Sequence, residues 1–401
     1  MTISATTQGL RPGVCTSSNR PVTPFDGQVI YMTDVDQTAV WDGTQWTVLA
    51  PIAGGRNVII NGAMQVHQRG TSTASITADG YYTADRWLGA VSGLGTWTQS
   101  VESDAPTGSG FRKSLKMLCT TANASPTGTN NLAVVTYIEG QNLQQFAKGT
   151  ASAKQFALSF WVKSNVTGTY VAELFDVDNT RQTALQYTIS SSATWEKKTL
   201  IFTADTTGAF DNDNAKSLQV TFWMGAGSGL TSGTLQTTWA SNTTANRAVG
   251  QINLAAATSN YWQITGVQLE AGAVATPFEF EDIGVTLAKC QRYFQKIGPI
   301  SNVASGMAYS TTQGLCSISL AVPMRIAPTS ITVSATASHY EMVRSNTAQT
   351  ACSAVPTINN SNPNAVSILA TIGAADLVAG NATFLVGVNS TSGWIGANAE
   401  L

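Results

Sequence analysis

The stretch Glu270–Ile297, EAGAVATPFEFEDIGVTLAKCQRYFQKI, stands apart because its apolar residues follow a helical period while the flanking sequence does not. These residues are spaced 4, 3, 4 and 3 positions apart, which gives one stripe on an α-helix and also an a/d seam of about two heptads. The seam consists of Ile283, Leu287, Cys290, Phe294 and Ile297. The spacing therefore predicts one helix over residues 282–298, stopped by Gly298-Pro299.

Charged residues flank this predicted helix in the order that a helix dipole favours. Acidic residues stand at its start and basic residues towards its end: Glu279, Glu281, Asp282, Lys289, Arg292 and Lys296. A lone helix of this length is marginal in water, so packing must hold it. Either its apolar stripe covers the chain's own β-structure, or it packs on copies of itself along a symmetry axis.

The composition of the whole chain favours an extended β-protein. The chain has 401 residues, enough for two or three domains, and only 11% of them are charged, against a usual value of about 25%. On the surface of an extended β-protein, Lys and Glu are often replaced by Thr, Ser, Asn and Gly. Thr suits a pleated sheet, and Asn and Gly suit turns. The formal net charge of −2 gives no basic field for nucleic acid.

The cysteines and the apolar runs bear on compartment and cofactors. The five cysteines are odd in number and far apart, which argues against a disulfide framework or a structural metal site. No leader-like N-terminus and no run of 18 apolar residues is visible, so we expect no membrane insertion. We expect no cofactor and synthesis in a reducing cytoplasm.

The chain divides into four predicted parts. Residues 1–54 form a small module, in which Asp42-Gly43 between Val40–Trp41 and Trp46–Leu49 is a hairpin signal. Residues 55–281 contain many short alternating runs with polar turns, typical of an antiparallel sandwich. Residues 282–298 are the linking helix, and residues 299–401 return to alternating patterns that suit a smaller sandwich.

The clearest predicted strands lie in the two sandwich regions. They are Ser114–Thr120, Leu132–Ile138, Gln155–Lys163, Thr169–Val177, Thr199–Thr203, Leu218–Met224, Tyr261–Leu269, Ile331–Val333, Val366–Ile372, Thr383–Val388 and Trp394–Ile395. The stretch Gly225–Ala248, rich in Gly and Thr, is predicted to be a long loop with a function of its own.

Several segments, taken in order, resemble a known family. They are NVIINGAMQVHQRG at 57–70, ADRW at 84–87, SFWVKS at 159–164, ITGVQLE at 264–270, ATPFE at 275–279 and CQRYF at 290–294. This succession resembles the jelly-roll module of bacteriophage tail-fibre and appendage proteins, which is similar to carbohydrate-binding modules. The run TSSNRP at 16–21, with YMTD at 31–34 and WDG at 41–43, resembles a module of phage virion proteins, and PMR at 323–325 resembles a domain that often follows CQRY.

The resemblance implies a virion structural protein that forms a homotrimer. Its N-terminal module would attach to other virion proteins, and its later domains would face a host-surface glycan. The expected localisation is the virion, assembled in the host cytoplasm. A head or tail decoration protein without receptor binding and a glycan-degrading enzyme are the alternatives.

Three tryptophans are candidates for stacking on a sugar ring. Trp161 and Trp223 lie on the faces of their strands opposite to the apolar residues, so each needs a partner. The partner is either a glycan or packing against a protomer or adjacent domain. Trp239, in the Gly- and Thr-rich loop, is the aromatic that we expect to be most exposed.

Catalytic and metal chemistry have weaker signals. Asp176 and Asp178, like Asp211 and Asp213, could offer oxygens to Ca²⁺ but match no complete calcium-loop spacing, and Asp is an ordinary turn residue. His67 and His339 fall in different predicted domains, and no nucleophile motif accompanies them. We therefore expect no metal and no catalytic residues, and we expect Asp85-Arg86 to belong to a buried or half-buried ion-pair network at a strand start.

Overall fold

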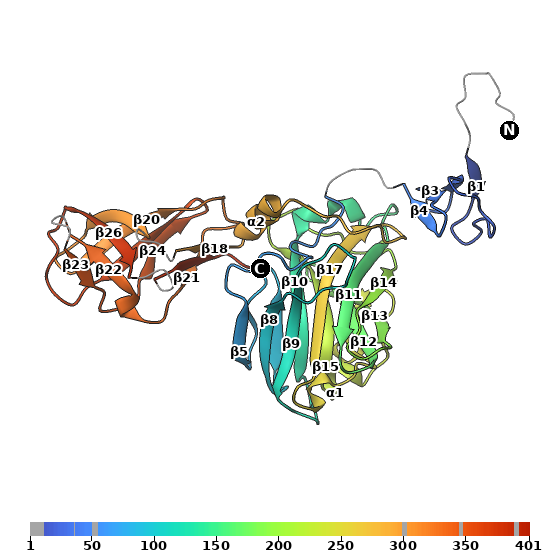
Figure 1. Cartoon of the computed structure of the whole chain (residues 1–401), viewed down its shortest axis with the longest axis horizontal. Coiled ribbons are helices and arrows are strands. Elements are labelled where there is room, and N and C mark those ends of the chain that lie inside the picture. Colours follow the sequence, from blue (N-terminus) through green and yellow to red (C-terminus); the bar gives the residue numbers. More distant parts are fainter. Residues whose placement is uncertain (1–11, 36, 50–54, 299–302, 345–347, 389–392) are drawn as a thin grey trace, which may run out of the picture.

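The predicted all-β class is confirmed by the computed structural model of the chain (Figure 1). The structure describes residues 12–35, 37–49, 55–298, 303–344, 348–388 and 393–401. In this part of the chain, no helix is long and apolar enough to cross a membrane. The boundary predicted between residues 54 and 55 lies next to residues 50–54, which are outside the described ranges.

The N-terminal module is a small sheet of four strands. In sheet order these are β1 (Gly13–Cys15), β2 (Val29–Met32), β3 (Gln37–Trp41) and β4 (Trp46–Val48). The predicted hairpin joins β3 to β4, where the Asp42 carboxylate accepts backbone N–H bonds from Thr44 and Gln45, both at 2.9 Å. These bonds, with those from Thr44 and Thr47 hydroxyls, lower the pKa of Asp42.

The central region is a sandwich of two antiparallel sheets that share one core. One sheet has seven strands in the order β16 (Ala240–Ser241), β13 (Arg181–Ile189), β12 (Gly168–Asp176), β15 (Lys216–Ala226), β10 (Asn131–Glu139), β7 (Leu88–Ser92) and β6 (Gly80–Tyr81). The other has six strands in the order β14 (Glu196–Phe202), β11 (Phe156–Ser164), β17 (Tyr261–Ala271), β9 (Ser114–Thr121), β8 (Thr96–Glu102) and β5 (Ser72–Ile76). Between β9 and β15 the chain passes repeatedly from one sheet to the other, as in a jelly roll.

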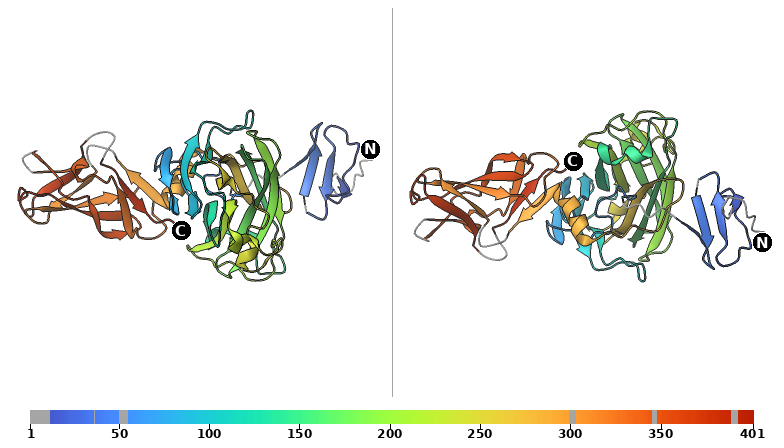
Figure 2. Two further views of the ribbon diagram at one scale, coloured as in Figure 1. Left: turned by 90° about the horizontal axis from the view of Figure 1, so that it is seen from below. Right: turned by 90° about the horizontal axis from the view of Figure 1, so that it is seen from above.

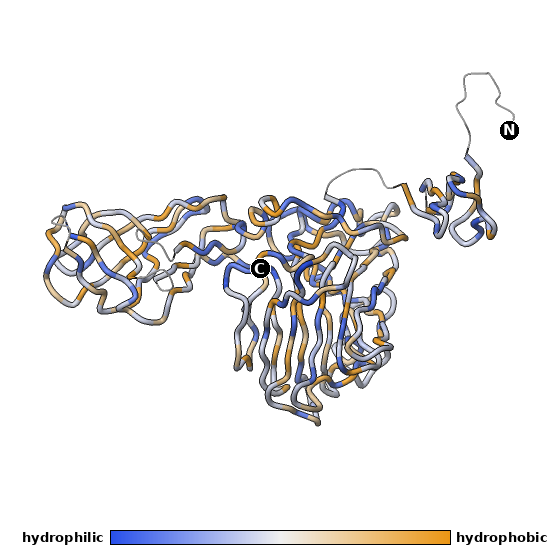
Figure 3. The backbone as a smooth tube through the Cα atoms, viewed as in Figure 1, coloured by the Kyte–Doolittle hydropathy of each residue, from blue (hydrophilic) through white to orange (hydrophobic). Residues whose placement is uncertain are grey.

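Alternation along the strands fills the space between the two sheets. Figure 3 shows hydrophobic and hydrophilic residues alternating along the strands, and the inward residues form one large core. Phe160 on β11 and Phe222 on β15 meet in its centre, with ring centres 5.0 Å apart. The predicted strands of this region agree closely with the observed ones because each buries one face. Short helices complete the region: η1 (Gly140–Asn142), η2 (Gln144–Phe146), α1 (Ser228–Thr231), η3 (Thr244–Asn246) and η4 (Leu254–Ala256).

The C-terminal unit extends from one side of the sandwich (Figures 1 and 2). Its larger sheet has the order β23 (Gln349–Ala351), β22 (Tyr340–Val343), β26 (Ala382–Gly387), β19 (Ala304–Ala308), β20 (Gln313–Ser319), β25 (Ala365–Thr371) and β24 (Thr357–Asn362). Its smaller sheet has the order β18 (Phe294–Ile297), β27 (Ile395–Asn398) and β21 (Ser330–Val333), and η5 (Ala337–His339) precedes β22. The core between the sheets has its own set of buried residues, including Tyr340, Met342 and Ile368.

The predicted helix over 282–298 is wrong in its second half. The helix α2 (Ile283–Gln291) is shorter, and its N-cap is Asp282, whose Oδ1 accepts the Gly284 N–H at 2.8 Å. The chain then turns, and β18 pairs antiparallel with β27 from the far end of the sequence. Gly396 on β27 makes room for the Phe294 ring, since a Cβ at Gly396 would lie 2.6 Å from it. The apolar period continued past the helix because Phe294 and Ile297 are buried or half-buried as strand residues instead.

Candidate functional site

A dense cluster of buried charges joins the sandwich to the C-terminal unit. Glu139, at the end of β10, is buried and accepts two bonds from the Arg292 guanidinium, both at 2.9 Å. The Tyr293 hydroxyl donates to the same carboxylate at 2.5 Å. Burial alone would raise the pKa of Glu139, but the bonds from Arg292 and Tyr293 lower it. The residue pair that follows α2 is thereby fixed to the sandwich.

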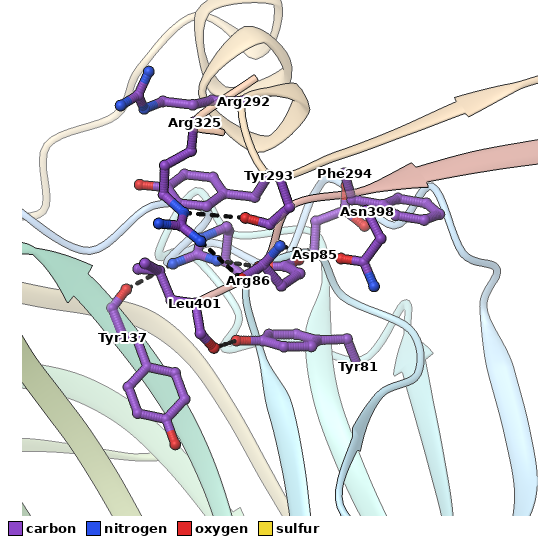
Figure 4. Close-up of polar contacts among 12 residues, drawn as sticks. Tyr81, Asp85, Arg86, Tyr137, Arg292, Tyr293, Phe294, Arg325, Asn398 and Leu401 are labelled. Carbon is purple, nitrogen blue, oxygen red and sulfur yellow. Dashed lines mark hydrogen bonds and ion pairs between the residues drawn. The ribbon is translucent and has the colours of Figure 1, made fainter. Parts of the chain in front are cut away.

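A second ion-pair group ties the end of the chain into the same cluster (Figure 4). Arg86 is 1% exposed, pairs with the Glu400 carboxylate, and donates to the Tyr137 carbonyl at 2.7 Å. Its guanidinium carbon lies 3.5 Å from the centre of the Tyr293 ring. Arg69 also reaches Glu400, at 3.1 Å. The predicted buried network around Asp85-Arg86 is therefore present, and its main partner is Glu400, more than 300 residues away in sequence.

The third contact in this cluster holds the backbone of the last residues. Arg325 donates from Nε to the Ala399 carbonyl at 3.1 Å and from Nη2 to the Glu400 carbonyl at 3.2 Å. Its own N–H donates to the Arg292 carbonyl at 2.8 Å. Each charged group described here has a protein partner and is largely buried, so the cluster is a structural joint. We call residues Asp85, Arg86, Glu139, Arg292, Tyr293, Arg325 and Glu400 the interdomain joint.

The joint also decides what remains of the predicted seam. Cys290 and Phe294 are 0% and 1% exposed, covered by their own chain, and Ile297 packs against the C-terminal core. Burial raises the pKa of the Cys290 thiol well above its ordinary value. Ile283 is 50% exposed and Leu287 is half-buried, and neither belongs to a buried core of the chain, whereas Ile297 is half-buried against the C-terminal core. A continuous seam of five residues is therefore wrong, because three of the five are used within the chain.

Two of the three candidate tryptophans are also covered. Trp223 does lie on the outer face of its sheet, but the segment after β15 folds over it and buries it, with Leu230 and Ala248 in contact. Its Nε1 donates to Glu173 at 3.1 Å, and Arg247 from the covering segment holds the same carboxylate at 2.7 Å. The predicted loop over residues 225–248 thus serves as a cover for this sheet.

Trp239 is the clearest error among the site residues. It is buried in the main core, its ring centre lies 5.5 Å from that of Phe156, and its Nε1 donates to the Thr203 carbonyl at 2.9 Å. The Lys148 ammonium lies 5.1 Å from the ring centre. Gly and Thr around it suggested an exposed loop, whereas the loop turns inward to close one end of the sandwich.

Trp161 alone of the three stays accessible, on the outer face of the six-stranded sheet. It is half-buried on β11, between core residues Phe160 and Val162 that point the other way. Its cross-strand neighbours are Lys197 on β14 and Thr265 on β17. The next row across the same face contains Lys163, Gln263, Lys116 and Ser100, one from each of four adjacent strands.

A second tryptophan, which the sequence analysis missed, stands beside Trp161. Trp195 directly precedes β14 and is half-buried; it lies two residues before Lys197, so it is a diagonal neighbour of Trp161, at about 7–8 Å. Its Nε1 donates to the Asp104 carboxylate at 3.1 Å, and the Lys163 ammonium lies 5.4 Å from its ring centre. No sequence signal would have paired Trp161 with Trp195, because only the strand register brings them together.

The Lys163–Asp104 ion pair holds the Trp195 ring in place. Burial alone would raise the pKa of Asp104, but hydrogen bonds from Lys163 and Trp195 lower it, so the carboxylate stays charged. Beneath this pair, Gln263 donates to the Ser114 hydroxyl at 3.2 Å, which in turn donates to the Asp104 carbonyl at 2.6 Å. These hydrogen bonds therefore hold polar side chains on this face in fixed positions. We call the outer face formed by Trp161, Trp195, Lys163, Asp104, Gln263 and Thr265 the tryptophan face.

A neighbouring aromatic ring closes one side of the tryptophan face. Phe111 lies against Gly266 of β17, where a Cβ would be 2.5 Å from the ring, and Gly266 has φ +62°. Glycine is required there on both counts. Beside it, the Thr265 hydroxyl is buried and has no hydrogen-bond partner among the described residues. A polar atom left in this state is costly unless something else satisfies it.

The paired aspartates that suggested calcium serve the fold. Asp176 is buried in an ion pair with Lys148 at 2.5 Å and accepts a bond from the Asn179 side chain at 3.0 Å. Asp178 accepts the Asp211 N–H at 3.0 Å, which ties the two turns together. Within the described ranges, no group of three Asp, Glu, His or Cys side chains is arranged to hold a metal ion.

Comparison with known proteins found structural similarities at low levels. No protein-family model and no curated protein matches the sequence. Among solved structures, the chain is similar to the enzymatically active domain of tailspike protein 4 of bacteriophage CBA120, with 15% identity, a TM-score of 0.29, and coverage of 54% of this chain and 21% of that chain. It is also similar to TmCBM61 in complex with β-1,4-galactotriose, with 8% identity, a TM-score of 0.27, and coverage of 54% and 99%.

A further similarity is to the family 11 carbohydrate-binding module of the cellulase Lic26A-Cel5E of Clostridium thermocellum. The identity is 12%, the TM-score is 0.25, and coverage is 49% of this chain and 96% of that module. The chain thus spans about a fifth of the tailspike structure and nearly the whole of each binding module. Similarities this low say nothing about what the chain binds, so the proposals below rest on its own residues.

The first prediction concerns the interdomain joint. Glu139→Ala leaves the Arg292 guanidinium and the Tyr293 hydroxyl without their common partner in a largely buried place. We expect a loss of about 2–4 kcal/mol in the free energy of unfolding, below the full value for a buried pair because Arg292 is 33% exposed. Urea denaturation measures it. Glu281→Ala, which removes the exposed pair with Lys289, is the control and should cost under about 1 kcal/mol. Equal losses for the two variants would contradict the joint.

The second prediction concerns pH. Burial raises the pKa of Asp85 to about 6 despite the nearby Arg69 and Gln68, and Glu400 also raises it. Because this folded-state value exceeds the unfolded value of about 3.9, the native state binds the proton more tightly, and the stability contributed by Asp85 rises as pH falls from 7 towards 4. Asp85→Asn cannot titrate and should lack this rise.

The measurement for Asp85 is the free energy of unfolding of both proteins at pH 7, 6, 5 and 4. The wild-type value relative to Asp85→Asn should increase by about 2–3 kcal/mol over that range. The lowered pKa of Glu139 acts with the opposite sign and at lower pH, and it is common to both proteins. A difference that does not change with pH would show that Asp85 titrates normally.

Proposed function

We propose that this chain is a non-enzymatic glycan-binding subunit of a bacteriophage tail fibre or appendage, and that the tryptophan face is its binding site. The observation that carries the proposal is the pair of half-exposed rings, Trp161 and Trp195, on an otherwise polar sheet face, with Trp195 held by the Lys163–Asp104 pair. Indole rings stack on the apolar face of a sugar, while hydroxyl, amide and charged groups beside them bond its hydroxyls. Lys197 on β14, directly across from Trp161, is an exposed polar neighbour of that ring.

Binding without cleavage is the part of the proposal that the carboxylates support. A glycosidase uses a pair of carboxyl groups, one of which must hold a proton near neutral pH. On the tryptophan face, Asp104 has a lowered pKa and is engaged by Lys163 and Trp195. Glu102, on the same sheet, accepts a bond from the Ser100 hydroxyl at 2.6 Å. The lowered pKa of Asp104 does not favour a proton donor there.

The virion role and the homotrimer complete the proposal. The resemblance of the N-terminal module and of the motifs around α2 supports them. At the start of α2, Phe280, Ile283 and Val285 are 55%, 50% and 47% exposed, so apolar side chains are available there for contacts between copies. Glu281 and Lys289 form an ion pair with each other in the same region. Three linked copies would turn weak single sites into tight binding to a repetitive surface.

The third prediction tests the tryptophan face. In a polysaccharide panel scored by array and by titration calorimetry, the full chain should bind at least one glycan. Trp161→Ala and Trp195→Ala should each weaken that binding about tenfold or more, since each removes one stacking ring. Their melting temperatures should change little because both rings are half-exposed. The matched control is Trp223→Ala, which should lower the melting temperature because Trp223 is buried.

Three outcomes would count against this assignment. Unchanged binding in Trp161→Ala and Trp195→Ala would move the site elsewhere. Release of reducing ends from a bound polysaccharide would show that the chain is an enzyme. If no glycan binds and virions that lack the protein adsorb normally, the decoration role is the better reading.

The fourth prediction tests whether the exposed apolar residues of α2 make contacts between copies of the chain. Val285→Asp with Ile283→Asp should convert the trimer to monomers, because charge would be placed in the contact between copies. Light scattering coupled to size exclusion measures the mass, and circular dichroism checks that the fold persists. Val378→Asp, at another exposed apolar position that is 61% exposed, is the control. A wild-type protein of monomeric mass would refute the trimer itself.

A further inference from the structure

Basic side chains are concentrated around the tryptophan face although the chain as a whole has a formal net charge of −2. Five of them lie on the outer face or at its edge: Lys163 on β11, Lys197 on β14, Lys116 on β9, and Arg112 and Lys113 directly before β9. Two acidic side chains, Glu102 and Asp104, share this exposed region. The balance on this face is therefore positive.

The two acidic groups do not neutralise the basic ones nearest Trp161. Asp104 pairs with Lys163, and Glu102 is bonded by Ser100. Lys197, directly across from Trp161, is exposed and forms no ion pair with any residue in the described ranges. Lys116 likewise has no acidic partner there, and its ammonium lies 5.0 Å from the centre of the Tyr261 ring.

Other charged residues near this sheet are already accounted for. Glu196 and Lys198 alternate with Lys197 along β14, so they point to the opposite side, where they pair with each other at 2.6 Å. Glu270, at the far end of β17, is buried and accepts bonds from the Thr276 backbone and hydroxyl, both at 2.7 Å. Neither the Glu196–Lys198 pair nor the Glu270 carboxylate therefore neutralises the positive charge of Lys197 or Lys116.

We infer that the ligand of the tryptophan face is an anionic glycan, whose carboxylate, sulfate or phosphate groups are met by Lys197 and Lys116 while Trp161 and Trp195 stack on its rings. This inference rests on the proposed function of the same face. Ammonium groups bond anionic oxygens more strongly than neutral hydroxyls. A cationic face in a chain with few charges also attracts an acidic polymer over several ångströms. A neutral glycan would leave both lysines without a counter-charge.

The fifth prediction uses probes that differ only in charge. Polygalacturonate is compared with its carboxyl-reduced form, and dextran sulfate with dextran, by calorimetry or biolayer interferometry on the full chain. We expect at least one acidic polymer to bind tenfold or more tightly than its neutral counterpart, and the advantage to shrink as salt rises from 50 to 300 mM. The two pairs separate a carboxylate preference from a sulfate preference.

Two variants separate the lysines from general charge. Lys116→Gln with Lys197→Gln should remove most of the preference for the acidic polymer. The control is Lys198→Gln, which removes the same charge from the opposite side of β14 and should leave the preference intact. A double variant that keeps the full preference overturns the inference.

The failure of this inference differs from the failure of the proposed function. If a glycan binds in a Trp161-dependent way but acidic and neutral partners bind equally, the anionic ligand is refuted and the glycan-binding face stands. If a correctly folded chain binds no glycan in the panel or among these four polymers, both are refuted.

Discussion

The arrangement of this molecule depends on buried charged side chains, each of which needs a partner of opposite charge. Glu139 is buried at the end of β10, and removing a carboxylate from water is costly unless strong donors meet it. Arg292 and Tyr293 supply them, and Arg86 imposes the same demand on Glu400. These pairs require the residues after α2 and the end of the chain to lie together on the sandwich. The interdomain joint thus fixes where the C-terminal unit sits and ends the helix that leads to it.

Three of the motifs that carry the family resemblance contribute residues to this joint. ADRW supplies Asp85 and Arg86, CQRYF supplies Arg292 and Tyr293, and PMR supplies Arg325. Others hold the neighbouring turns: Glu270 of GVQLE binds Thr276, and Glu279 of ATPFE accepts N–H bonds from Gly55 and Asn57 at 2.8 and 2.9 Å. These motifs therefore contribute to the connection between the two β-units. Another of the segments, SFWVKS, lies elsewhere on the sandwich and supplies Trp161 and Lys163.

The tryptophan face is built differently from the interdomain joint. Its aromatic rings are half-exposed, and its one ion pair lies at the surface, where Asp104 keeps 45% of its side chain exposed. The hydrogen bonds beneath it hold the face in shape without covering it. The opposite sheet shows the contrast, since there a segment of the chain covers Trp223 with Leu230 and Ala248. The protein covers Trp223 on one sheet face, whereas Trp161 and Trp195 on the other stay half-exposed.

The sequence by itself determined the strands and which residues face inward, because a strand with one buried face must alternate. It also determined that Asp85-Arg86 would be buried in ion pairs. It could not limit α2 to nine residues, since Phe294 and Ile297 satisfy a helical and a strand pattern equally until β27 pairs with them. It placed Trp239 at the surface because local composition does not reveal which way a loop folds. Trp195 came to stand beside Trp161 only through the register of β11 and β14, which depends on contacts between residues distant in the chain.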